Sequence, residues 1–386
     1  MMLDENTKIL RNKVRDFINT VAIPLEHPTL ANDVAALDEV CSRLRAQAKE
    51  AGIYGPQLPR EWGGLGLNWT ACAEIFEEAG RGMLGPLALN CAPPDQPNML
   101  TLLHLGTEAQ KQEFLGPLVR AEKRACFAMT EPPPGAGSDP NMLQTEATRD
   151  KNGWRINGHK KFISGGVGAD FALLPAKTRE GVTLFIVPAN TPGYRVLRDI
   201  ATVTGYQIGG HAEIRLEDCH VSDDAVLGQI GMGMKHIQLR LEPARLSHCM
   251  RFIGRATRAL DIAQDYVQKR DAFGNRLSDL QQIQAMIADA HIDLHASRLM
   301  TRECAMLMDQ NVSVKNESAM TKIFVSEAVG RVTDSCVQMM GALGVSEDTV
   351  VSSIWREARP FRIYDGANEL HRAFLAKRLL QSPHNQ

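Results

Sequence analysis

Asp365 lies between Tyr364 and Gly366 near the end of the chain and is a candidate for proton transfer. A well-placed carboxylate can take a proton from a weakly acidic carbon if the site also stabilises the negative charge that develops. Aspartate is also common at helix N-termini, and the stretch from Gly366 to Glu369 is compatible with a helix start. The residues alone therefore leave Asp365 as a general base or as a helix cap.

A second group of residues could hold a ligand. Thr130 and Ser138 flank a turn rich in Pro and Gly, where hydroxyls and backbone N–H groups can meet a pyrophosphate or the polar edge of a ring system. Phe162 could lie against such a ring, and Arg270 could pair with a pyrophosphate through its forked guanidinium. The ordinary alternatives are a capped β-turn, a core aromatic and a solvated helix face.

The composition narrows the class of protein. The 386 residues are 44% hydrophobic and 23% charged, as in a globular protein with a large core. The 43 basic side chains nearly balance the 45 acidic ones, which argues against nucleic acid or an anionic membrane as an obligatory partner. The eight cysteines show no C-x-x-C pair and no zinc spacing, so we expect buried free thiols and no metal site.

The cellular location is inferred from what the sequence lacks. The N-terminus has no apolar segment typical of a signal peptide, and no apolar run approaches the length of a membrane span. We therefore expect a soluble, cytoplasmic protein, or a mitochondrial matrix protein only if a transit peptide has been removed.

Three zones of different periodicity must position these residues. Residues 1–122 show helical spacing of apolar side chains, residues 123–228 show strand patterns with Gly, Asn, Asp and Pro between them, and residues 229–386 return to long helical patterns. We expect strands that include 154–157, 171–174, 182–187 and 212–216, and C-terminal helices over about 230–267, 279–309, 313–343 and 367–381. The fold class is thus α+β and multidomain: N-terminal helices, a β-barrel-like middle domain and a C-terminal four-helix bundle.

Five segments along the chain resemble the signatures of the acyl-CoA dehydrogenase family, in the order and spacing of that family. They are Cys126–Pro132 with Gly137–Asp139, Gly158–Gly165, Arg270–Gly274 with Gln281, Gln338–Gly344, and Tyr364–Gly366. Each segment alone would be weak evidence, but five in register across nearly the whole chain are specific.

The resemblance implies FAD as the cofactor. Thr130 would bind the pyrimidine side of the flavin, Ser138 would lie near its phosphates, Phe162 would replace the more common Trp against one ring face, and Ser164 would replace Thr beside flavin N5. The other FAD-binding residues implied are Met129, Ile163, Arg270, Phe273, Gln281, Gln338, Gly341, Ala342 and Glu369. The sequence departs from the family pattern by the inserted residues Pro132–Pro134, which puts the contacts of Ser138 in doubt, and by Ala342 in place of a frequent Gly.

In the family, the Arg270 segment reaches the FAD of a neighbouring subunit, and Gln338, Gly341 and Ala342 complete that site. The resemblance therefore implies an obligate homotetramer, a dimer of dimers.

The resemblance also assigns the chemistry: a base takes the α proton of an acyl-CoA thioester while a hydride leaves the β carbon for flavin N5, which gives a 2-enoyl-CoA. Most members carry Glu as the base, and here that position is Asp365. Some relatives hold the base at the position of Ala244, which cannot accept a proton. Candidate substrate contacts are Glu242, Arg245, Tyr364 and Gly366.

Other functions remain open at this stage. The leading prediction is a dehydrogenase whose reduced flavin passes its electrons to an electron-transfer flavoprotein. The alternatives are an oxidase of the same fold, acting on acyl-CoA or on nitroalkanes, and a catalytically silent scaffold that binds FAD or acyl-CoA. Neither the length nor the branching of the acyl chain follows from the sequence.

Overall fold

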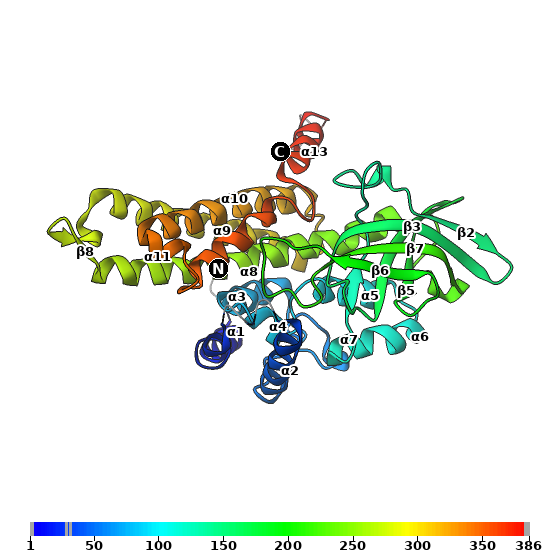
Figure 1. The fold of residues 1–386 in the computed structure, drawn as a ribbon, viewed down its shortest axis with the longest axis horizontal. Helices are drawn as coiled ribbons and strands as arrows, with labels where there is room; N and C mark the ends of the chain where they lie inside the picture. Colours follow the sequence, from blue (N-terminus) through cyan, green and yellow to red (C-terminus); the bar gives the residue numbers. More distant parts are fainter. Residues whose placement is uncertain (1–3, 28–29, 31–32, 382–386) are drawn as a thin grey trace.

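The computed structural model describes residues 4–27, 30 and 33–381. The sheet lies at one end of its long axis and the longest helices at the other, and the N-terminal helices lie below them (Figure 1). This is the expected α+β architecture. Pro93 and Pro94, which interrupt the helical pattern of the first region, directly precede helix α5 (Asp95–Leu105). Pro97 lies in the first turn of that helix, where the missing N–H has no partner to lose.

The N-terminal region packs its helices against the C-terminal ones. Its main helices are α1 (Glu5–Phe17), α2 (Val34–Glu50), α3 (Trp69–Arg81), α5 and α7 (Gly116–Arg120), with the shorter α4 (Gly85–Ala88) and α6 (Glu108–Gln110) between them. Helix α3 is buried along most of its length and crosses the long helix α8 (Gly233–Lys269) closely. A Cβ atom on Gly80 would lie 2.2 Å from the carbonyl oxygen of Arg251, so a glycine is required for this approach.

The middle region is a curled seven-stranded sheet. Its strands are β1 (Ala125–Phe127), β2 (Glu146–Asp150), β3 (Gly153–Ser164), β4 (Phe171–Thr178), β5 (Gly181–Pro188), β6 (Tyr194–Asp199) and β7 (His211–Val221). The strand order is β1-β4-β2-β3-β7-β6, with β5 paired to β4. The four predicted strands all fall within these elements. Trp154 and Ile156 point into the core while Arg155 and Asn157 are exposed, as alternation predicts.

The C-terminal region contains the three longest helices, α8, α9 (Gln281–Asp309) and α10 (Lys315–Met340), followed by α11 (Ala342–Val345), α12 (Val351–Ala358) and α13 (Asn368–Gln381). The three long helices agree with the predicted segments to within a few residues. Helix α12 was not predicted, because eight residues give too short a periodic signal. It packs against α8 and α10 and leads directly into the segment that contains Asp365.

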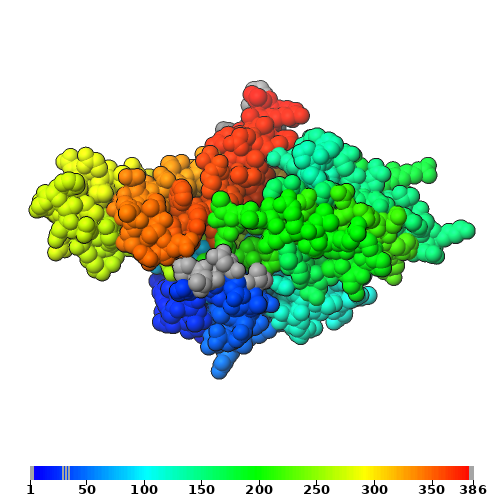
Figure 2. Space-filling model, in the orientation of Figure 1, coloured from blue at the N-terminus to red at the C-terminus, as the bar shows by residue number. Residues whose placement is uncertain are grey.

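Helix α13 stands out from the body of the molecule in the space-filling view (Figure 2). At the end of the long axis farthest from the sheet, a short hairpin of β8 (Asp271–Ala272) and β9 (Asn275–Arg276) forms the tip between α8 and α9 (Figure 1). The predicted cofactor residues Arg270 and Phe273 therefore lie at the end of the molecule farthest from the sheet.

Candidate active site

Asp365 lies in the turn that follows α12, and its carboxylate faces α8. Its Oδ2 is 3.1 Å from Nε2 of His248, and the side chain is 19% exposed. Burial alone would raise the pKa of Asp365, but the His248 hydrogen bond and the nearby Arg240 and Arg245 outweigh it and hold this pKa well below its usual range. The carboxylate is therefore ionised at neutral pH. The carboxylate contacts His248 on α8, whereas a helix cap would accept a hydrogen bond from the backbone at the start of α13.

His248 is fixed in one tautomer by Arg251. Nη2 of Arg251 lies 3.2 Å from Nδ1 of His248, and because arginine can only donate, Nδ1 must accept. The proton of the neutral ring is then on Nε2, from which it is donated to Asp365. Burial lowers the pKa of His248 to about 4, against the opposing effect of Asp365, so the ring is neutral at pH 7. Arg251, His248 and Asp365 form a directed chain of hydrogen bonds.

Cationic groups also hold the backbone of the turn. Asp365 has a φ of 52° and Gly366 one of 96°, two successive left-handed residues. The carbonyl oxygen of Asp365 accepts from Nε of Arg245 at 2.9 Å and from Nε2 of His371 at 3.1 Å. The carbonyl oxygen of Gly366 accepts from Nζ of Lys322 at 2.7 Å. Within the described residues the backbone N–H of Asp365 donates no hydrogen bond, so it is available to a ligand.

Aromatic rings enclose the His248 side of the site. The Tyr364 ring centroid is 4.7 Å from that of His248, and Phe252 and Phe361 stack at 4.7 Å beside them. These rings keep His248 in a low-dielectric environment, in which its hydrogen bond to Asp365 is strengthened.

The predicted flavin-facing residues of the sheet lie together where β1 ends and β3 ends. The backbone N–H of Lys161 donates to the carbonyl oxygen of Thr130 at 2.8 Å, and the Thr130 hydroxyl donates to the carbonyl oxygen of Lys161. The Thr130 oxygen can still accept a hydrogen bond from a ligand. Met129 precedes it and is half-buried.

Phe162 is presented by a β-bulge. Between the pairs Lys160–Ile214 and Ile163–Ala212, two residues of β3 face one residue of β7. Phe162 there has a φ of 59° and is 57% exposed, so it is not the core aromatic that the ordinary interpretation requires. The side chain of Ile163 is buried in the sheet core, so only its backbone can reach a cofactor. Ser164 lies 3.1 Å from Nδ1 of His211 on β7.

The loop that follows Thr130 is closed by one buried carboxylate. Glu131 accepts hydrogen bonds from the backbone N–H groups of Ala136, Gln144 and Thr145, from the Thr145 hydroxyl, and from Nζ of Lys160 at 2.9 Å. Although its burial opposes ionisation, the Lys160 charge and these donors lower the pKa of Glu131 to about 2. The loop with the inserted prolines is thus anchored at its base, while Ser138 is exposed.

The remaining predicted cofactor residues are not brought to the sheet. Arg270, Phe273 and Gln281 are exposed at the tip of the α8–α9 hairpin, and Phe273 is 91% exposed. By the rise of an α-helix, Arg270 lies about 33 Å along α8 from His248. Gln338, Gly341 and Ala342 are exposed where α10 meets α11, and Glu369 is exposed on α13. One chain therefore contains two separate halves of the predicted cofactor site.

Three of the four predicted substrate contacts, Arg245, Tyr364 and Gly366, lie next to Asp365. Arg245 donates to the Asp365 backbone rather than pairing with Glu242 on its own helix. Glu242 is half-buried and precedes Arg245 by three residues. Arg245 thus supports the turn directly, while Tyr364 and Gly366 flank the carboxylate.

Several residues of the site were not singled out from the sequence. They are His248, Arg251, Lys322, His371, Arg240 and the Glu131–Lys160 pair. A signal was present: Arg240, Ala244, His248 and Arg251 recur at four, four and three residues and share one face of α8. Cationic residues on an otherwise buried helical face are unusual in a core.

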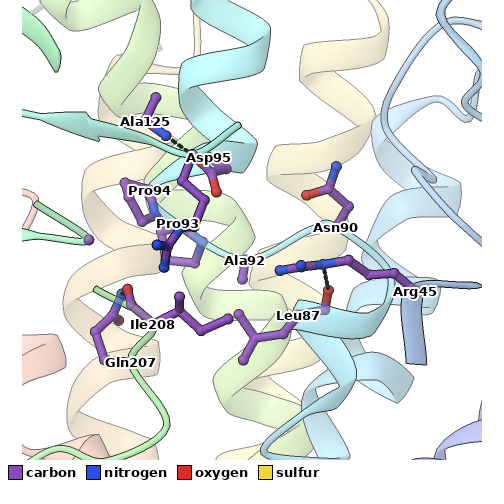
Figure 3. Close-up of a pocket in the computed structure, with 12 residues that line it drawn as sticks. Arg45, Leu87, Asn90, Ala92, Pro93, Pro94, Asp95, Ala125, Gln207 and Ile208 are labelled. Carbon is purple, nitrogen blue, oxygen red and sulfur yellow. Dashed lines mark hydrogen bonds between the residues drawn. The ribbon is translucent and has the colours of Figure 1, made fainter. Parts of the chain in front are cut away.

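A small hollow lies between the turn before α5 and the end of β3. It is lined by Pro93, Pro94, Asp95, Gly165 and Ile208, among others (Figure 3). Asp95 Oδ1 accepts from the backbone N–H of Ala125 at 2.8 Å, and this bond joins the start of α5 to the start of β1. Asp95, which directly follows the two prolines, therefore helps to fix the position of α5 relative to the sheet.

Across the described ranges, no group of three or more His, Cys, Asp or Glu side chains is placed to hold a metal ion. All eight cysteines are free and buried, as the sequence predicts. In the part of the chain that the structure describes, no helix has the length and apolar character needed to cross a membrane.

Three family models match consecutive parts of the chain. The acyl-CoA dehydrogenase N-terminal domain matches residues 4–122, the middle domain residues 126–219 and the C-terminal domain residues 231–380. Human mitochondrial short-chain specific acyl-CoA dehydrogenase is 32% identical over 388 residues, which cover 98% of this chain and 91% of that protein. Chicken acyl-CoA dehydrogenase family member 11 is 36% identical over 354 residues. That match covers 88% of this chain but only 45% of the longer chicken protein.

Solved structures agree with the sequence matches. Butyryl-CoA dehydrogenase from Megasphaera elsdenii superposes with a TM-score of 0.84 at 27% identity and covers 98% of this chain and 99% of its own. An acyl-CoA dehydrogenase from Geobacillus kaustophilus has the same TM-score at 26% identity, with 98% of each chain covered.

Proposed function

Because this chain belongs to the acyl-CoA dehydrogenase family, we propose that it binds FAD and dehydrogenates an acyl-CoA thioester between its α and β carbons, with Asp365 as the base. The observation that carries the proposal is the half-buried, ionised Asp365 carboxylate, held by His248 on one side of a left-handed turn. A carboxylate that is kept unprotonated in a hydrophobic site is suited to accept a proton.

The residues of the chain fit FAD. Phe162 exposes its ring on a bulge beside the Thr130 and Ser164 hydroxyls, an arrangement that a flat ring system with a polar edge would cover. At the other end, Arg270 and Phe273 are exposed at the tip of the α8–α9 hairpin. Bound FAD would supply the hydride acceptor. A second subunit would complete the site by adding its Arg270 segment, which supports the homotetramer implied by the family.

The protein's own groups account for proton removal. Asp365 would take the α proton, and its backbone N–H, which has no partner in the described residues, is free to polarise the thioester carbonyl. His248 keeps the carboxylate oriented, while Arg245, His371 and Lys322 hold the turn at its carbonyl oxygens. Such preorganised donors lower the cost of the enolate-like charge.

The experiment that tests this function is an anaerobic titration. The purified protein should carry FAD, visible by its absorbance, and one class of acyl-CoA should bleach that absorbance without oxygen. Transfer to an electron-transfer flavoprotein then identifies a dehydrogenase, whereas rapid hydrogen peroxide formation in air identifies an oxidase. FAD-loaded protein that no acyl-CoA bleaches would refute the proposal and leave a nitroalkane oxidase or a silent scaffold.

A further inference from the structure

Arg240 is a buried cation without a counter-ion. Its side chain is 5% exposed, and its guanidinium lies 4.0 Å above the ring of Phe127. Among the described residues, its side chain donates one hydrogen bond, from Nε to Oδ1 of Asn98 at 2.8 Å, and no carboxylate forms an ion pair with it. Burial lowers the pKa of Arg240 to about 10, which leaves it charged at neutral pH. A buried, unpaired charge is costly unless something else compensates it.

Asn98 supplies a second unsatisfied donor at the same place. It is fully buried on α5, and its Nδ2 has no hydrogen-bond partner among the described residues. Arginine can only donate, so Oδ1 must face Arg240, and the amide N–H₂ is left beside the guanidinium. The terminal nitrogens of Arg240 also donate to no described residue. Guanidinium and amide donors with nothing to receive them are typical of an oxyanion site.

Arg240 lies on the same helix as His248, the partner of the proposed base. Arg240 and His248 are eight residues apart on one face of α8, about 12 Å by helical rise. Phe127, under the guanidinium, ends the strand that leads to Met129 and Thr130. Arg240 is also close enough to Asp365 for the two charges to affect each other's pKa. The other charged or titratable groups that act on Arg240 are Asp95 and the Cys126 thiol.

Positive charge exceeds negative charge around the turn that contains Asp365. Arg245, Arg251 and Lys322 surround the turn, and none of them forms an ion pair with a side-chain carboxylate in the described part of the chain. Arg251 and Lys322 are occupied by backbone, amide or His248 acceptors, whereas Arg240 keeps free donors. A site that holds only a hydrocarbon acyl chain needs no free guanidinium donors.

We propose that the acyl group of the substrate carries a second anionic group, a carboxylate or a phosphoryl group, which binds between Arg240 and Asn98. The proposal rests on the acyl-CoA dehydrogenase function and specifies its substrate class. It differs from a contact to the CoA portion, because the anion belongs to the part of the substrate that changes from one acyl-CoA to another.

Occupation of this subsite would also affect the base. Arg240 is one of the charges that hold the pKa of Asp365 down. An oxyanion bound to Arg240 would offset that charge and raise the proton affinity of Asp365. The anionic substrate would therefore make the carboxylate a stronger base when it binds.

The test compares acyl-CoAs of equal chain length with and without a terminal anion. Anaerobic bleaching is measured with pentanoyl-CoA and hexanoyl-CoA, with the five- and six-carbon dicarboxylic mono-CoA thioesters, and with an acyl-CoA that bears a phosphoryl group. We expect at least a 10-fold higher kcat/KM for one anionic class, and that class distinguishes carboxylate from phosphoryl. Equal or better use of the neutral chains would overturn the proposal.

Three variants locate the effect. Arg240→Gln should lose the preference for the anion, so that anionic and neutral chains of equal length are bleached at similar rates, and Asn98→Asp should do the same because it supplies an internal carboxylate to Arg240. Arg240→Lys should retain part of the preference. If Arg240→Gln weakens neutral and anionic substrates equally, Arg240 contacts CoA and the subsite is refuted. Absence of bleaching by any thioester refutes the proposed function instead.

Retention of FAD absorbance controls for folding. A variant that loses its yellow colour is replaced by Arg240→Met, which keeps the stem packed against Phe127. Binding of the acyl-CoA ligands to the oxidised protein can be measured from the shift of the flavin spectrum, and this readout does not depend on turnover. The anionic ligands should show about 10-fold weaker binding in the variant.

Discussion

Asp365, the proposed base, has its side chain and its backbone held in place by groups from α8 and α13. The carboxylate is tied to His248, which is tied in turn to Arg251, so its direction is set by two side chains of a rigid helix. The main chain beneath it is held by Arg245 and His371. A short side chain with few rotamers, on a fixed turn, is well suited to present one oxygen to a substrate.

Asp365→Asn tests the base at the scale of one residue. The variant should remain yellow, while its rate of anaerobic bleaching falls by about 10²–10⁴-fold, the usual contribution of a positioned base. Asp16→Asn, an exposed aspartate on α1, serves as the matched control and should bleach normally. Near-normal bleaching of Asp365→Asn would require the base to be placed elsewhere.

His248 is a positioning residue, and its replacement should change a pH profile. The hydrogen bond from His248 lowers the pKa of Asp365, and the carboxylate is an active base only above that pKa. In His248→Ala the pKa rises, so the acidic limb of kcat/KM should move to higher pH and the rate should drop about 10-fold. Because a glutamine amide can donate from nearly the same position as Nε2, His248→Gln should recover most of the loss. An unchanged profile in His248→Ala would show that Asp365 does not depend on this bond.

At the scale of elements, Glu131 joins the loop of residues 131–145 to strand β3. Its partner Lys160 is fully buried, and the two charges lie 2.9 Å apart. This contact explains how a segment with three consecutive prolines is kept in place next to the proposed flavin site. The Thr130 hydroxyl and the Phe162 bulge both depend on the register that Lys160 and Lys161 establish.

Glu131→Gln should therefore loosen both the fold and the cofactor site. It leaves Lys160 buried without a counter-charge, which costs about 3–5 kcal/mol in the free energy of unfolding. Urea denaturation and FAD retention on dialysis are the measurements, with the exposed Glu146→Gln as control. In the wild type this contribution is present above pH ~4.3 and is lost as the pH falls towards about 2, because the folded state lowers the pKa of Glu131. Equal stability of the two variants would contradict this role.

At the scale of the whole molecule, the residues of the proposed FAD site lie at opposite ends of one chain. The sheet end presents Thr130, Phe162 and Ser164, and the tip presents Arg270 and Phe273 (Figure 1). The long helix α8 keeps these ends apart, so residues of one chain cannot meet on one cofactor molecule. Subunits packed with the tip of one against the sheet of another would place them together.

Arg270→Gln tests this arrangement. The variant should assemble like the wild type but bind FAD about 10–100-fold more weakly, since a charge-assisted hydrogen bond contributes about 1.5–3 kcal/mol. Sedimentation velocity gives the assembly state and absorbance gives the FAD content, with the neighbouring Lys269→Gln as control. A wild-type monomer that keeps FAD at high dilution would refute a cofactor site shared between subunits.

Local pattern was enough to predict the class of fold and most of its elements. Long helices such as α8, α9 and α10 produce many turns of periodic signal, and Trp154–Asn157 alternates as a half-buried strand should. Helix α12 could not be predicted, since its eight residues are helical because of the neighbours that bury Ile354 and Ala358. Short elements depend on tertiary packing, which periodicity does not report.

By itself the sequence determined the order of helical and strand regions, the candidacy of Asp365 and the likeness of five segments to one family, because motifs and periodicity are properties of neighbouring residues. Only the tertiary structure decided which groups surround that carboxylate. His248 and Arg251 lie on α8, more than a hundred residues before Asp365, and Asn98 lies on α5. The pKa of Asp365, the tautomer of His248 and the unpaired donors of Arg240 arise from burial and distance, and both depend on how helices remote in sequence pack together.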